Sequence, residues 1–137
     1  MKDENISLDD DFNGETIGEA LLRPTKIYAK EVKTLLENVK VAGISHITGG
    51  GFIENLPRAL KKGLGMKIYR DSYEVPAIFK FIEEKGKIDH DEMYQVFNMG
   101  VGLAVIVDDA DKQKVLDLID DAFVLGQVTD KEGIVLL

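Results

Sequence analysis

Three consecutive glycines, Gly49 to Gly51, lie between an apolar, strand-like run and a segment with helical periodicity. Glycine lacks a Cβ and adopts positive φ easily, so successive backbone amides in such a loop can converge on one point. A helix that starts just beyond the loop adds unpaired amide donors and partial positive charge. Phosphate is the ligand that suits this arrangement. A mobile hinge is the alternative interpretation of the same glycines.

The composition of the chain excludes several classes of function. A chain of 137 residues with 45% hydrophobic content suffices for one ordinary domain. Its formal net charge of −8 argues against binding to nucleic acid polymers, which requires a basic surface. The absence of cysteine excludes disulfides and thiolate metal sites and fits a reducing compartment. No apolar run approaches membrane-spanning length, so we expect a cytoplasmic protein without a membrane partner.

The chain divides into a leader and a domain. Residues 1–17 are acidic and poor in large apolar side chains, which predicts a flexible leader or linker remnant. Residues 18–137 form the predicted domain. Its first helix is expected near residues 25–38, with Thr25 as the N-cap. A short strand over residues 41–47 should then lead into the glycines.

The rest of the domain alternates helical and strand patterns. A helix with Ile53, Leu56 and Leu60 on one face follows the glycines, and Pro57 limits how early it can begin. The run 101–107 is almost wholly apolar, which predicts a strand at the centre of a sheet covered on both faces. The other expected elements are a strand at 66–70, helices at 76–86, 89–100 and around 115–122, and a closing hairpin of 123–128 with 134–137. This order predicts a layered α/β sandwich in which helices cover a mixed sheet.

Few other residues suggest chemistry. The two histidines are far apart in sequence, so no histidine metal cluster is expected and no metal ligand is assigned. His46 adjoins the glycines and has a ring nitrogen that can donate a hydrogen bond to a bound phosphate. Asn98 lies at the turn from a helix to the 101–107 strand. It is either a C-terminal helix residue or a ligand for a substrate.

Three separate motifs in this chain resemble one enzyme family. They are LLRPTKIY at residues 21–28, HITGGGFIENLPR at residues 46–58 and EMYQVFNMGVG at residues 92–102. In this order they resemble the C-terminal domain of phosphoribosylformylglycinamidine cyclo-ligase, the aminoimidazole ribonucleotide synthetase of purine biosynthesis. The resemblance extends from about Gly18 to the last residue.

The resemblance implies an ATP-dependent ligase that forms a C–N bond. The family converts formylglycinamidine ribonucleotide and ATP to aminoimidazole ribonucleotide, ADP and phosphate. ATP and Mg²⁺ are bound mainly by an N-terminal half, which also supplies much of the homodimer contact, so this chain alone is expected to be inactive. Carried over to this sequence, the family's pattern makes His46 the catalytic candidate. The substrate-binding candidates are Thr48, Gly49, Gly50, Gly51 and Asn98.

Other interpretations stay open. The chain is either a fragment of a longer cyclo-ligase or a stand-alone module that binds a phosphorylated ligand, with a regulatory role and no catalysis. A third interpretation is the C-terminal domain of a related ATP-dependent enzyme in the same superfamily.

Overall fold

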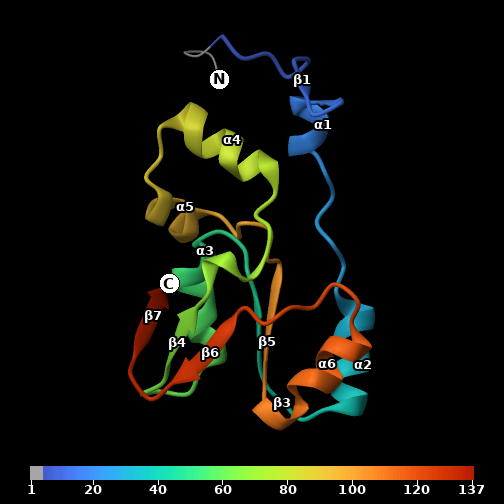
Figure 1. Ribbon diagram of the computed structural model, residues 1–137, viewed down its shortest axis with the longest axis vertical. Coiled ribbons are helices and arrows are strands. Elements are labelled where there is room, and N and C mark those ends of the chain that lie inside the picture. The colour runs from blue at the N-terminus through green and yellow to red at the C-terminus, as the bar shows by residue number, and fades with distance from the viewer. Residues whose placement is uncertain (1–4) are drawn as a thin grey trace.

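Helices and strands alternate along residues 5–137, which are the residues described by the computed structural model (Figure 1). The α/β class predicted from the sequence is confirmed. The helices are α1 (Ile17–Leu21), α2 (Ala29–Asn38), α3 (Gly51–Asn55), α4 (Ala77–Gly86), α5 (His90–Val96) and α6 (Lys112–Leu118). The strands are β1 (Asp11–Phe12), β2 (Glu15–Thr16), β3 (Val41–His46), β4 (Gly65–Ile68), β5 (Leu103–Val107), β6 (Gly126–Thr129) and β7 (Gly133–Leu136).

The strands of residues 5–137 form three small sheets. Strands β1 and β2 make a hairpin, and β3 pairs with β5 in antiparallel fashion, with His46 opposite Leu103. The third sheet has the order β6-β4-β7, in which β4 is antiparallel to β6 and parallel to β7. This sheet is mixed, as expected. Helices α2 and α6 lie side by side next to the β3–β5 pair, on the opposite side from the mixed sheet (Figure 1).

The predicted closing hairpin is wrong. Strands β6 and β7 do not pair with each other, because β4 lies between them and forms a ladder with both. The physical reason is burial: Met66 and Ile68 of β4 are almost fully buried, and a strand with neighbours on both sides satisfies its backbone without water. Strand β4 is remote in sequence, so local turn patterns do not reveal it.

The predicted central position of the 101–107 strand is also wrong. Within residues 5–137, β5 pairs only with β3, and each of its residues is half-buried. Its apolar character therefore does not reflect cover on both faces. All five residues of β5 instead contribute to the wall of a cavity, which is described below with the site.

Several helices differ from their predicted bounds. Helix α5 ends at Val96 instead of continuing to residue 100, and α6 covers Lys112–Leu118 instead of residues around 115–122. Helix α2 begins at Ala29, and Thr25 is not its N-cap, because the preceding residue, Tyr28, packs its ring beside His46 and Gly102 instead. Helix α3 starts before Pro57, and the proline lies in a 3₁₀ turn, Leu56–Ala59, that continues it. Proline is tolerated there because the first residues of a helical turn need no intrahelical amide.

The acidic N-terminal segment contains some regular structure. The expected leader, residues 1–17, begins with four residues that lie outside the described part of the chain. The rest includes the β1–β2 hairpin, and Thr16 caps α1 through a reciprocal capping box with Glu19. Phe12 contacts Phe81 of α4, with 5.4 Å between ring centroids. The boundary between leader and domain at residues 17 and 18 stays a prediction.

The hydrophobic core lies beneath the glycine segment. Helices α3 and α5 meet there, and Phe52, Leu56, Met93, Tyr94 and Met99 are each at most 1% exposed. The rings of Phe52 and Tyr94 contact edge to face, with centroids 5.4 Å apart. The best-packed part of the chain therefore supports the loop that the sequence singles out.

Candidate functional site

The loop between β3 and α3 places two of its three glycines in conformations that other residues avoid. Gly50 has φ of 91° and Gly51 has φ of 53°, both in the left-handed region. The amide of Gly51 donates a hydrogen bond to the carbonyl of Thr48, at 3.1 Å, which closes the turn. Gly50 and Gly51 are therefore required by the backbone conformation, and the segment forms a tight turn into the helix.

The three glycines have different surroundings. A Cβ built at Gly51 would collide with the carbonyl of Tyr94 in α5, so this residue lets two helices approach closely. A Cβ at Gly50 would meet the side chain of Glu54. Gly49 has nothing within 4 Å of such a Cβ and lies outside the positive-φ region. Gly49 is thus the exposed position of the loop and the one that tolerates a side chain.

A buried asparagine holds the loop from below. Asn55 is 1% exposed, and its Nδ2 donates to the carbonyls of Thr48, Gly49 and Gly51 at 3.3, 3.2 and 2.8 Å. The buried Ser45 hydroxyl donates to the backbone carbonyl of Asn55 at 2.8 Å. Sequence reasoning did not assign this asparagine a role. The signal was present, because a residue at position 55 shares a helical face with the buried Phe52.

Several backbone amides of the loop have no acceptor in the described chain. Within residues 5–137, the amides of Gly49, Gly50, Phe52 and Ile53 make no hydrogen bond, whereas the carbonyls of Thr48, Gly49 and Gly51 are satisfied. Unpaired amides beside satisfied carbonyls give the loop a net donor character. Such a backbone segment can accept an anionic oxygen.

His46 and Asn98, the predicted residues outside the glycine loop, belong to segments that a backbone hydrogen bond joins. His46 ends β3 as an exposed residue, and the next amide, that of Ile47, donates to the carbonyl of Gly102 at 2.8 Å. Asn98 lies in the turn before that glycine. Its Oδ1 accepts from the amide of Gly100 at 3.0 Å, so the side chain stabilises the turn, and the residue lies beyond the end of α5 at Val96. The prediction that Asn98 is a residue of the helix is therefore wrong, and its role as a substrate ligand stays a prediction.

Tyr28 is a neighbour that sequence reasoning missed. Its ring lies edge to face with the His46 ring, with centroids 6.2 Å apart. Its hydroxyl occupies the space where a Cβ on Gly102 would stand. The ammonium group of Lys26 lies 5.5 Å from the centroid of the Tyr28 ring. The segment before α2 therefore forms an aromatic wall next to the exposed histidine.

The charges beside the loop are mixed. The Glu54 carboxylate lies against Gly50, and its oxygen is 3.9 Å from a guanidinium nitrogen of Arg58. Both side chains are about two-thirds exposed, so solvent screens this pair. Arg58 also donates to Oδ1 of Asn55 at 3.1 Å. An anion bound at Gly50 would therefore meet both a repelling carboxylate and an attracting guanidinium.

Two tyrosines, one of them beneath the loop, are unsuited to proton transfer near neutral pH. Burial raises the pKa of Tyr94, which packs under the loop. Burial also raises the pKa of Tyr73, to a value far above neutral pH. Both phenols stay protonated, so their role is to fill and shape the core. Within residues 5–137 there is no group of three acidic or histidine residues that could hold a metal ion.

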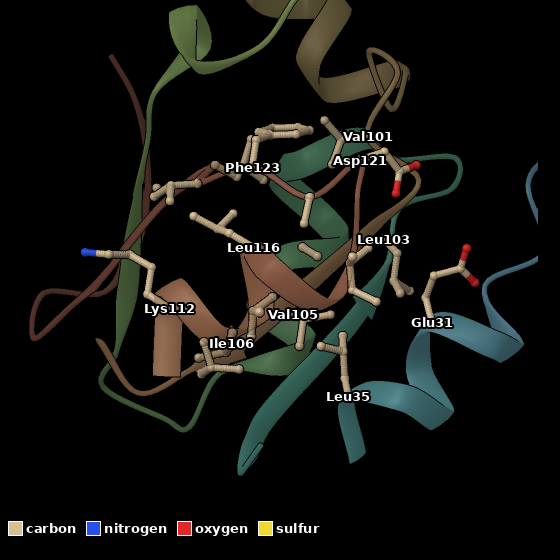
Figure 2. Close-up of a pocket in the computed structure, with 18 of the residues that line it drawn as sticks. Glu31, Leu35, Val101, Leu103, Val105, Ile106, Lys112, Leu116, Asp121 and Phe123 are labelled. Atoms are coloured by element: carbon tan, nitrogen blue, oxygen red, sulfur yellow. The ribbon is translucent and has the colours of Figure 1, made fainter. Parts of the chain in front are cut away.

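A separate cavity of about 800 Å³ lies between β5, α6 and the segment before β6. Figure 2 shows its mainly aliphatic walls, with Leu103, Val105 and Leu116 directed inward. The ammonium groups at its rim are already paired: Lys26 lies 2.5 Å from Asp121 and 3.1 Å from Glu31, and Lys112 lies 2.8 Å from Asp109. None of the predicted site residues lines this cavity.

Fold and loop together define a class: an α/β domain in which a tight glycine loop with unpaired amides leads into a short helix. Comparison with known families is more specific. Residues 1–137 match the model of the family described as AIR synthase related protein, C-terminal domain, and the chain belongs to this family.

The relatives agree with this assignment. The chain is 47% identical to the phosphoribosylformylglycinamidine cyclo-ligase of Oceanobacillus iheyensis over 95% of its own length and 40% of that protein's. It is 49% identical to the cyclo-ligase of Caldanaerobacter subterraneus subsp. tengcongensis over 90% of its length and 38% of that protein's. The chain thus spans about two fifths of the curated relatives that it matches.

A solved structure shares the fold. Escherichia coli HypE, a hydrogenase maturation protein, superimposes with a TM-score of 0.64 at 18% identity, covering 88% of this chain and 41% of HypE. At this identity the likeness concerns the fold alone. No helix within residues 5–137 has the length and apolar content needed to cross a membrane.

Proposed function

We propose that this chain is the substrate-binding C-terminal part of a cyclo-ligase that converts formylglycinamidine ribonucleotide and ATP to aminoimidazole ribonucleotide, ADP and phosphate. The observation that carries the proposal is the loop from Thr48 to Gly51, with its unpaired amides and left-handed glycines, in a chain whose relatives are cyclo-ligases. The cytoplasm is the expected compartment for such an enzyme.

The described residues support a role in binding more than in nucleotide chemistry. Residues 5–137 hold no acidic cluster for Mg²⁺, so we place ATP and Mg²⁺ mainly on the N-terminal half of the full-length enzyme, which we expect to be a homodimer. Within this chain, the amides of the loop would hold an anionic group of the ribonucleotide. His46 and Asn98 would orient its polar atoms from the two flanks.

A titration tests the loop. We expect ribose 5-phosphate to shift the NMR amide signals of Thr48 to Phe52 at millimolar concentration. The Gly50→Val variant should lose this response, because a β-branched residue is strongly disfavoured at φ of 91°. Gly63→Val is the matched control and should respond like the wild type, because Gly63 has a similar φ of 90° but lies outside the loop, and a Cβ there meets nothing within 4 Å. A wild type in which this segment stays silent would refute the anion loop.

Removing the Glu54 charge beside Gly50 distinguishes two substrate groups that the loop could bind, the phosphate and the amidine. If the loop binds the phosphate, Glu54→Gln should tighten binding of ribose 5-phosphate about two- to fivefold at low salt, because one repulsive charge is removed. If the loop instead faces the cationic amidine of the substrate, the same variant should leave ribose 5-phosphate binding unchanged and weaken binding of the full ribonucleotide. Binding of the full ribonucleotide by this variant is therefore tighter in the first case and weaker in the second.

Activity tests the assignment to a larger enzyme. This chain alone should form no aminoimidazole ribonucleotide from ATP and substrate, whereas co-expression with the N-terminal half of a relative should restore formation. Product formation by the isolated chain would contradict the proposal. Binding of ligand with no activity beside a competent N-terminal half would favour a regulatory module.

A further inference from the structure

The buried side chain of Asn55 makes more hydrogen bonds than any other described side chain near the site. It is 1% exposed and reaches three carbonyl groups around the glycines, of which the carbonyl of Gly51 is nearest at 2.8 Å. An amide NH₂ has two hydrogens, so these contacts are shared among the three carbonyls. Its Oδ1 accepts from Arg58, which leaves both ends of the side chain engaged.

We propose that Asn55 is the positioning residue of the glycine loop: by holding the carbonyls of Thr48, Gly49 and Gly51 on the inner side, it leaves the amides of Gly49 and Gly50 free for the ligand. This inference rests on the proposed function of the loop. It adds the residue that keeps the loop in its binding conformation before any ligand arrives.

The chemistry of the loop explains why such a residue is needed. A glycine-rich segment has access to many conformations, and ordering each residue costs roughly 1–2 kcal/mol of conformational free energy. A loop that is ordered in advance does not pay this cost when it binds. The carbonyl groups also have to turn away, since a carbonyl oxygen directed at an anion repels it. An amide group beneath the loop meets both requirements at once.

Ser45 provides a matched control in the same network. Its buried hydroxyl donates to the backbone carbonyl of Asn55 at 2.8 Å but to none of the loop carbonyls that the asparagine side chain holds. Removing either side chain deletes a buried hydrogen bond and destabilises the protein. Only the asparagine variant should change the loop itself. A purely structural role for Asn55 would make the two variants alike.

The experiment compares wild type, Asn55→Ala and Ser45→Ala by NMR, well below their unfolding temperatures. Without ligand, Asn55→Ala should broaden or multiply the amide signals of Thr48 to Gly51, while Ser45→Ala keeps them. In titrations with ribose 5-phosphate, Asn55→Ala should bind about tenfold more weakly or worse, and Ser45→Ala within about twofold of wild type. Equal loop spectra and equal affinities in the two variants would overturn the proposal.

Two further measurements keep the outcomes separate. If Asn55→Ala does not fold, Asn55→Ser replaces it. In addition, the side-chain amide hydrogens of Asn55 should exchange slowly with solvent in the wild type, and rapid exchange would overturn the proposal. If the wild type binds no ribose 5-phosphate, the proposed function fails, and the ligand-free spectra alone decide whether Asn55 positions the loop.

Discussion

The glycine loop and the β5–α6 cavity differ in how completely their apolar residues are packed. Under the loop, Phe52 and Leu56 are 0% exposed, and a buried amide satisfies the carbonyls above them. Along β5, every residue is half-buried and contributes to the wall of a cavity of about 800 Å³ (Figure 2). Both regions are rich in apolar residues, so composition does not separate them.

The comparison indicates where the domain is rigid. A loop that binds by its backbone needs a support that does not move, and close packing supplies it. The cavity region has open space, and its β3–β5 sheet has two strands whereas the mixed sheet has three. We therefore expect substitutions near the loop to cost more stability than similar substitutions at the cavity.

The largest effect is expected from a matched pair of phenylalanines. Phe52→Ala should lower the free energy of unfolding by about 3–5 kcal/mol, because it leaves a void in a closely packed core. Phe123→Ala should cost only about 1–2 kcal/mol, since this ring is 39% exposed and mainly stacks on Tyr73, with centroids 5.0 Å apart. Urea denaturation measures both. Equal losses would remove the distinction between the two regions.

A second pair sharpens the comparison within the loop. Gly51→Ala should cost about 2–3 kcal/mol, because alanine is strained at φ of 53° and its Cβ would press against the Tyr94 carbonyl. Gly49→Ala should change stability by less than about 0.5 kcal/mol, since its Cβ reaches open space. Thermal unfolding of the two variants gives the difference. A Gly49 variant as unstable as the Gly51 variant would show that the whole loop is packed.

The smallest effect concerns the ion pair at the rim of the cavity. A hydrogen bond from Lys26 lowers the pKa of the Asp121 carboxyl. The carboxylate therefore adds stability above its pKa in the unfolded chain, and this contribution is lost as the pH falls through the lower pKa of the folded protein. Asp121→Asn should cost at most about 0.5 kcal/mol at pH 7, because the side chain is 66% exposed.

The pH dependence of stability gives a separate test of the Lys26–Asp121 ion pair. The difference in stability between wild type and Asp121→Asn should shrink from about pH 5 downward and vanish near about pH 2, where the aspartate is protonated. A difference that stays constant over this interval would show that the pair contributes through packing. A large difference at neutral pH would show that the rim of the cavity is more tightly held than its exposure indicates.

Local patterns in the sequence predicted several elements well. The strand before the glycines, the strand at residues 66–70 and the helix from Pro76 to Gly86 correspond to β3, β4 and α4. These elements follow from apolar periodicity and from proline and glycine at their ends, which act within a few residues. The start of α2 at Ala29 was not predicted, because the position of Tyr28 depends on its contact with Gly102, which is remote in sequence.

The sequence by itself determined the family, the α/β class and the position of the glycine loop, because motifs, periodicity and the need for positive φ are local properties of the chain. Only the tertiary structure decided that β4 lies between β6 and β7, that β5 faces a cavity and that Asn55 holds the loop from beneath. Each of these depends on which distant segments meet. Strand pairing and burial are settled by the free energy of the whole packed domain, and the pattern of one segment does not encode its partner.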